Sequence, residues 1–138
     1  MRYVLDTHTF LWFISGDPAL PPAVRARIEA PDAGRYLSVG SLWEMAIKVN
    51  AGKLHVGMPS PMLIDQHVLG NGLRILGIGA DHLERFSQLP LYHKDPFDRL
   101  IIAQSLSEDI PILGRDAMFD ADGVRRYWDT AAPGDRQE

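Results

Sequence analysis

Short apolar runs that alternate with longer amphipathic segments are the feature that most constrains how this chain folds. The apolar runs predict buried strands at residues 2–5, 36–39, 73–76, 110–113 and 124–128. The amphipathic segments predict helices at residues 8–15, 23–30, 41–50, 61–69, 80–89 and 95–107. Strands that alternate with helices in this way predict an α/β fold, with a mainly parallel sheet of four to five strands flanked by helices.

The length and uniform composition indicate a single domain. A chain of 138 residues is long enough to bury one core. No repeat, low-complexity tract or linker divides it, so we expect one domain over residues 1–130, followed by a polar tail over residues 131–138.

The sequence contains no cysteine, which excludes disulfides, thiolate zinc sites and a cysteine nucleophile. No apolar run approaches the ~20 residues of a membrane span, and Asp6 interrupts the apolar start that a signal peptide would need. We therefore expect a soluble, cytoplasmic protein with no membrane partner.

Acidic residues fall where the predicted strands end. Asp6 ends the first strand, Glu44 lies in the first turn of the helix after the second, Asp98 lies in the first turn of the helix before the fourth, and Asp116 follows the fourth. Functional groups of parallel sheets gather beyond the carboxyl ends of the strands. Carboxylates brought together there repel one another, and a hard divalent cation relieves that repulsion. The pattern thus indicates a Mg²⁺ or Mn²⁺ site.

The net charge of −4 argues at first against a nucleic-acid partner. Without the four acids named above, 14 acidic residues stand against 14 basic ones. Divalent ions bound at the site would neutralise the four, so the objection weakens.

Each acid also has a purely structural interpretation. Asp6 can cap the first helix, Asp116 can cap a short turn at residues 117–119, and Asp95 can cap the helix that contains Asp98. Ser41 and Glu44 match a capping box, and Glu44 can pair with Lys48 four residues later. No acid is diagnostic alone, and only their combination carries the functional hypothesis.

The combination resembles PIN-domain ribonucleases, most closely the VapC-type toxins of bacterial toxin–antitoxin pairs. The resemblance covers nearly the whole chain and rests on four blocks in the family's order, VLDTHTFLW (4–12), SLWEMAIK (41–48), HKDPFDRLIIAQ (93–104) and LGRDAMF (113–119). It implies a PIN-like nuclease domain over residues 1–130. By position, it implies that the catalytic and metal-binding acids are Asp6, Glu44, Asp98 and Asp116, with Asp95 as a neighbour that supports Asp98 or only caps its helix. One departure is Gly114, because the family usually has threonine or serine there to help orient the site.

The resemblance implies an endoribonuclease that hydrolyses RNA phosphodiester bonds with Mg²⁺ or Mn²⁺, acting as the toxin of a toxin–antitoxin pair. It also implies a homodimer, and an antitoxin whose C-terminal segment fills the acidic groove. The alternative is a catalytically inactive PIN fold that binds RNA or protein. A signalling receiver domain is disfavoured, since Asp6 lacks a paired acid and no lysine follows Leu113.

Cations near the acids are candidates for contacts with the substrate backbone. Lys48, Arg99 and Arg115 each lie within four residues of a proposed site acid, although Lys48 and Arg99 can equally serve to neutralise those acids. The dense apolar run at residues 10–13 is either part of an interface or a helix enclosed by its own domain.

Overall fold

The computed structural model describes residues 1–129, and its centre is a five-stranded parallel sheet with the order β3-β2-β1-β4-β5. The strands are β1 (Arg2–Leu5), β2 (Gly34–Ser38), β3 (Arg74–Leu76), β4 (Ile112–Leu113) and β5 (Arg126–Tyr127). The predicted α/β fold with a parallel sheet flanked by helices is confirmed. The polar tail expected at residues 131–138 lies outside the described residues.

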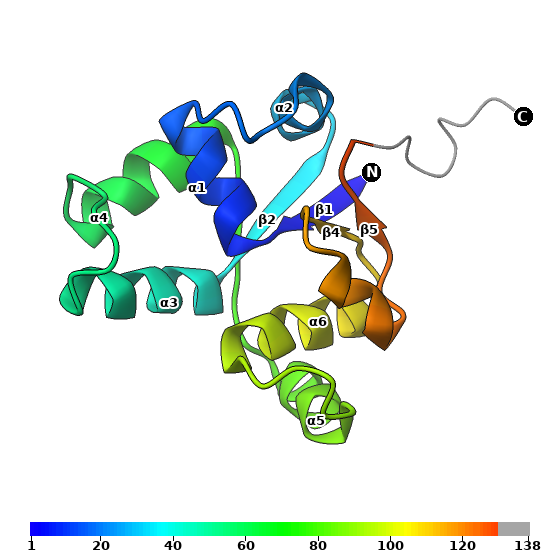
Figure 1. Cartoon of the computed structure of the whole chain (residues 1–138). Coiled ribbons are helices and arrows are strands. Elements are labelled where there is room, and N and C mark those ends of the chain that lie inside the picture. The colour runs from blue at the N-terminus through cyan, green and yellow to red at the C-terminus, as the bar shows by residue number, and fades with distance from the viewer. Residues whose placement is uncertain (130–138) are drawn as a thin grey trace, which may run out of the picture.

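Side chains of the strands alternate between two apolar cores, as a sheet buried on both faces requires. Tyr3 and Leu5 belong to one core, which also contains Phe10 of α1 (Thr7–Ser15) and Ile28 of α2 (Pro22–Glu29). Val4 points to the other core, together with Ile112 of β4 and Ile101 and Ile102 of α6 (Pro96–Glu108). The helices α2 and α6 accordingly lie on opposite sides of the sheet (Figure 1).

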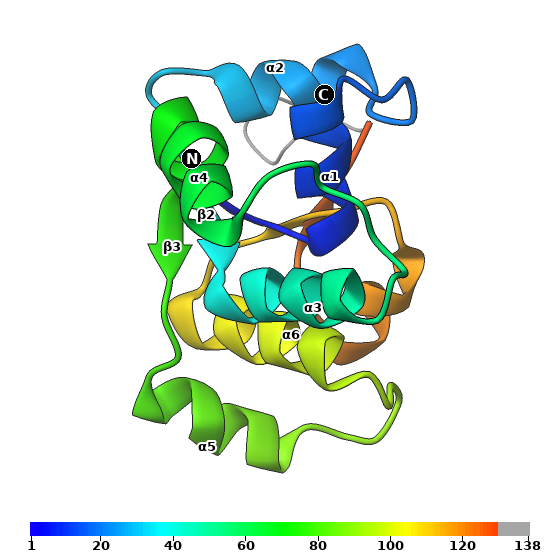
Figure 2. The same cartoon turned by 90° about the vertical axis from the view of Figure 1, so that its left-hand side faces the viewer.

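The remaining helices extend these layers. Figure 2 shows α2 and α4 (Ser60–Leu63) at one end of the molecule, α3 (Val39–Asn50) beside α6 in the middle, and α5 (Ala80–Gln88) beyond α6. The helix expected at residues 61–69 is in fact three short pieces, because α4 continues into a π-helical turn (Ile64–Val68) and a 3-10 turn (Leu69–Asn71). Among residues 1–129, no helix is long and apolar enough to cross a membrane.

The apolar run of residues 10–13 is enclosed within the domain. Phe10 and Phe13 are buried in the first core, and Leu11 and Trp12 are half-buried against it. Of the two interpretations of this run, the structure supports the helix surrounded by its own domain.

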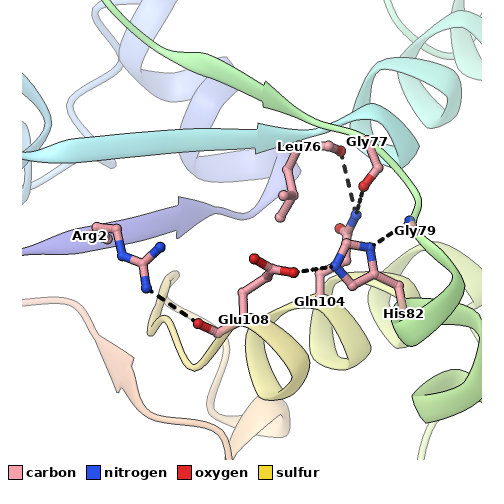
Figure 3. Close-up of polar contacts among 7 residues, drawn as sticks. All are labelled: Arg2, Leu76, Gly77, Gly79, His82, Gln104 and Glu108. Atoms are coloured by element: carbon pink, nitrogen blue, oxygen red, sulfur yellow. Dashed lines mark hydrogen bonds and ion pairs between the residues drawn. The ribbon is translucent and has the colours of Figure 1, made fainter.

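A buried histidine fastens α5 to α6 (Figure 3). Nδ1 of His82 accepts a hydrogen bond from the Gly79 amide at 2.9 Å, so the ring proton lies on Nε2 and is donated to Glu108 Oε2, also at 2.9 Å. Gln104 of α6 donates to the carbonyl oxygens of Leu76 and Gly77, where the chain leaves β3. These bonds hold the crossover from β3 to α5 against α6.

Candidate functional site

Asp6 lies where β1 ends and α1 begins, at the middle of the sheet. Its Oδ1 accepts a hydrogen bond of 2.7 Å from the Thr9 amide, so the carboxylate caps α1. The side chain is buried, with the residue only 7% exposed. Burial raises the pKa of Asp6, hydrogen bonds from Thr9 and the charge of His8 lower it, and the nearby Asp116 raises it.

Gly114 makes room for the second oxygen of Asp6. A Cβ atom at residue 114 would lie 2.8 Å from Asp6 Oδ2 and 3.2 Å from its Cγ. A larger residue at this position would therefore displace the carboxylate or the backbone. The departure expected at Gly114 thus affects Asp6 directly, and a side-chain hydroxyl at residue 114 could not coexist with the present position of Asp6.

Glu44 is held from two sides. Its Oε1 accepts a hydrogen bond of 2.9 Å from the Thr7 hydroxyl, and its Oε2 lies 3.0 Å from Lys48 Nζ. The Thr7 hydroxyl also lies 2.9 Å from Ser41 Oγ, which can supply the second proton of this chain. Sequence reasoning missed Thr7 as a partner of Glu44, and the Asp6-Thr7 pair in the first block was the only signal for it.

The capping box expected at Ser41 is wrong. Helix α3 begins at Val39, and Ser38 is its N-cap, with Oγ accepting from the Gly40 amide at 3.1 Å. Ser41 is already inside the helix, so its buried hydroxyl is available for Thr7. The ion pair expected between Glu44 and Lys48 is present, and Lys48 is therefore committed to neutralising an acid.

The pKa of Asp98 shows that the acids lie close to one another. This pKa is raised to about 7, mainly by burial and then by the charges of Asp95, Glu44, Asp6 and Asp116, in that order. All four neighbours act on one carboxylate, although they come from α3, from the end of β1, from the start of α6 and from the segment after β4. The structure thus brings the four predicted acids into one region at the carboxyl edge of the sheet.

Asp95 and Asp116 are helix caps as well as neighbours of Asp98. Oδ1 of Asp95 accepts from the amides of Phe97 and Asp98 at 2.8 and 3.2 Å, at the start of α6. Oδ1 of Asp116 accepts from the Met118 amide at 3.0 Å and caps the 3-10 helix Ala117–Asp122. Asp95 and Asp116 therefore each cap a helix and also raise the pKa of Asp98.

The acids have the right chemistry for a hard divalent ion, and they are more widely spaced than a closed ligand shell. Within residues 1–129, no group of three or more acidic or histidine side chains is arranged closely enough to hold a metal ion as the side chains stand. The all-oxygen donor set and the repulsion that raises the pKa of Asp98 both favour a cation at the centre of the group. An ion bound there would draw Asp6 and Asp98 together.

Of the three candidate cations, Lys48 is paired with Glu44, and the two arginines have different surroundings. Arg99 is 8% exposed, donates to the carbonyl oxygens of Pro90 and His93, and stacks 4.9 Å from the centre of the Phe86 ring. It holds the segment before α6, and this burial contradicts a role as substrate contact. Arg115 is exposed beside the acids and lines a cavity of about 460 Å³ with Asp6 and Asp116.

A family model and several solved structures agree with this architecture. The PIN domain family matches residues 3–122. Among solved structures, VapBC2 from Rickettsia felis, bound to a DNA fragment from its promoter, contains a chain with a TM-score of 0.70 and 17% identity. That likeness covers 94% of this chain and 100% of the other.

FitAcB from Neisseria gonorrhoeae gives a TM-score of 0.61 at 19% identity, over 92% of this chain and 96% of that one. FitAB bound to the IR36 DNA fragment gives 0.58 at 20% identity, over 92% and 94%. At these identities the likeness shows the fold alone, and no functionally curated protein sequence matches the chain. The match over residues 3–122 and the parallel sheet with acids at its carboxyl edge lead to one conclusion: this chain belongs to the PIN domain family.

Proposed function

We propose that this protein is a metal-dependent endoribonuclease of the PIN family that acts in the cytoplasm as the toxin of a toxin–antitoxin pair. The observation that carries the proposal is the pKa of Asp98, raised to about 7 by burial and by four other carboxylates. Such a concentration of negative charge destabilises the folded protein unless a cation neutralises it, and perturbed carboxylates in this arrangement are typical of functional sites.

In this proposal Asp6 and Asp98 hold the ion, with Asp116 and Glu44 as additional ligands. A divalent ion bound there supplies charge neutralisation at the phosphodiester and activates water. The protein's own part is positioning. The hydrogen bond from the Thr9 amide fixes one oxygen of Asp6, and Thr7 together with Lys48 fixes both oxygens of Glu44. Asp98 is left without a hydrogen bond from any other residue in the described part of the chain, and its oxygens remain free for the ion.

The direct test is cleavage of single-stranded RNA by the purified protein with Mg²⁺, with Mn²⁺ and with EDTA. We expect cleavage only with a divalent ion. Asp6→Asn and Asp98→Asn each should lower the rate at least ~100-fold, while Asp81→Asn on α5 should not. Full activity of both site variants would refute the assignment of the site. Binding of RNA without cleavage under any of these conditions would favour an inactive binding module instead.

The proposed antitoxin has two apolar grooves to occupy. One is lined by apolar residues of α1 and of the segment after α3, including Leu11, Ile14, Leu54 and Val56. The other lies between α3 and α4 and is lined by Leu42, Met45, Val56, Met58 and Leu63, among others. An amphipathic helix suits such grooves, and an arginine that extends from it would satisfy the same carboxylates as the ion. Co-purification with the product of a short adjacent gene would test this partner.

The proposed homodimer is supported by exposed apolar side chains on α3. Trp43 is 62% exposed and Ile47, one turn later on the same helix face, is also exposed. The Trp43 ring lies edge-on to Phe97 of α6, with the ring centres 5.3 Å apart. An exposed patch of this composition beside a functional site is typical of protein interfaces.

A further inference from the structure

Beside the acids, α1 and the segment after β4 form the two walls of a cavity. His8, Trp12, Arg115 and Ala117 line it, and Asp6 and Asp116 form the end that it shares with the acids. Its volume of about 460 Å³ falls within the ~300–1,000 Å³ range of small-ligand sites. A ligand that reached the acids would therefore extend past Trp12 and Arg115.

Flat side chains are stacked along this cavity. The Arg115 guanidinium carbon lies 4.7 Å from the centre of the Trp12 ring, and the His8 ring centre lies 5.7 Å from it at an interplanar angle of 32°. His8 and Trp12 are four residues apart on α1 and so share a helix face. Trp128 packs edge-on against Trp12, with the ring centres 6.0 Å apart. Together His8, Trp12 and Arg115 form a platform, called here the stacking platform.

Arg115 keeps its charge available. Two carboxylates share its cavity, yet within residues 1–129 its guanidinium makes no ion pair or hydrogen bond, and its contact is with the Trp12 ring. By contrast, Lys48 and Arg126 are each paired with a carboxylate. A guanidinium that lies over an aromatic ring and makes no ion pair can stack on a base and donate to a phosphate at the same time.

We propose that the stacking platform seats one unpaired base of a single-stranded RNA, next to the phosphodiester that lies at the acids. This inference rests on the proposed function and adds the place where the substrate is held. Stacking on a tryptophan–arginine platform requires a base that is free of a duplex, which selects single strands and is tolerant of sequence. The Arg115 N–H groups would meet the phosphate that joins the seated nucleotide to the scissile one.

The test is binding of a short single-stranded oligoribonucleotide in EDTA, where the proposed cleavage is off. Binding is followed by quenching of tryptophan fluorescence and by the salt dependence of the affinity. We expect Arg115→Gln and His8→Ala each to weaken binding, by roughly tenfold for Arg115→Gln. Arg115→Lys should keep the wild-type salt slope yet still weaken binding, because it retains the charge and loses the plane. Arg85→Gln, which removes an exposed arginine of α5, should bind as the wild type does.

Trp12→Phe shows whether the fluorescence quenching comes from the stacking platform or from a tryptophan elsewhere on the surface. It should remove most of the quenching while retaining most of the affinity, whereas Trp43→Phe should leave the quenching in place. Unchanged affinity of Arg115→Gln and His8→Ala would overturn the stacking platform, as would equal affinity for a duplex RNA of the same sequence. These results are independent of the proposed function, which fails instead if the wild-type protein cleaves no RNA with Mg²⁺ or Mn²⁺.

Discussion

At the end of β1, the two oxygens of the Asp6 carboxylate have different surroundings. Oδ1 binds the Thr9 amide at 2.7 Å, and Oδ2 faces Gly114, where a Cβ would approach to 2.8 Å. Asp95 and Asp116 likewise bind helix amides through Oδ1. Since an N-cap requires only one oxygen, capping does not compete with metal binding; it fixes the direction of the remaining oxygen.

Gly114→Ala tests this tight contact. The added Cβ should push Oδ2 away and misplace the carboxylate, lowering metal-dependent cleavage by at least ~10-fold at a stability cost of about 1–3 kcal/mol. Cleavage rates across a Mn²⁺ titration, together with thermal unfolding, measure both effects. Gly77→Ala is the matched control, because a Cβ there meets no atom within 4 Å. Wild-type activity and metal affinity in Gly114→Ala would mean that the Asp6 carboxylate is not confined as described.

The pH dependence of stability should reveal Asp98. Its pKa is about 7 in the folded protein, against a usual value of 3.8, so between these values the folded state keeps a proton that the unfolded state has released. Metal-free protein should therefore lose stability as the pH rises towards 7, with no further loss from this group above it. Asp98→Asn should flatten the decline, because the amide does not ionise.

The measurement is thermal unfolding in EDTA at about pH 5 and about pH 8, repeated with Mn²⁺. A bound ion stabilises the folded state, so Mn²⁺ should raise the melting temperature of the wild type at the higher pH and that of Asp98→Asn far less. The same pH decline in both proteins would show that Asp98 is not the destabilising group.

The polar side chain of His82 ties α5 to α6. His82 is buried and links Gly79, before α5, to Glu108, at the end of α6. His82→Ala should cost about 1–3 kcal/mol, because the Gly79 amide loses its acceptor and a cavity remains. Hydrogen exchange should increase at residues 77–88, and RNA cleavage per folded molecule should stay unchanged. The exposed Glu84→Gln is the control, and equal protection of α5 in His82→Ala would disprove the tether.

The helices and strands themselves were largely predictable from the sequence. Short apolar runs and helical patterns predicted every strand and all the long helices to within a few residues, because burial on both faces of a parallel sheet leaves a continuous apolar signal. The segment at residues 61–69 was an exception. Its apolar pattern is that of one helix, but the backbone departs into π and 3-10 turns before the left-handed Gly72.

Contacts between distant residues account for what the sequence did not reveal at the site. The acids were found because they recur at strand ends. The bond from Thr7 to Glu44 joins side chains 37 positions apart, and no local pattern encodes it. Arg99 was placed among the substrate contacts because it follows Asp98, yet a helix turns neighbouring side chains to different faces, and Arg99 points to the carbonyl oxygens of residues 90 and 93.

For the whole molecule, the proposed homodimer predicts the effect of changing the exposed face of α3. Trp43→Glu and Ile47→Glu should each convert a dimer into a monomer, since both place a charge at the centre of an apolar contact. Light scattering coupled to size-exclusion chromatography measures the mass directly. Met62→Glu, an equally drastic change at an exposed apolar residue of α4, should leave the dimer intact. A monomeric wild-type protein at micromolar concentration would refute the homodimer.

The strand order also determines when the molecule becomes active during its synthesis. The central strand β1 pairs with β2 on one side and with β4 on the other, and the acid that follows β4 is residue 116. Domains are translated from the N-terminus at ~5–20 residues per second and fold as units. A nascent chain on the ribosome can pair β1 with β2 early, but it lacks the second neighbour of β1 and the last of the four carboxylates until residue 116 has been added. For the proposed toxin, this means that a growing polypeptide is harmless to the messenger that encodes it before that residue has been added, which leaves the antitoxin this time in which to arrive.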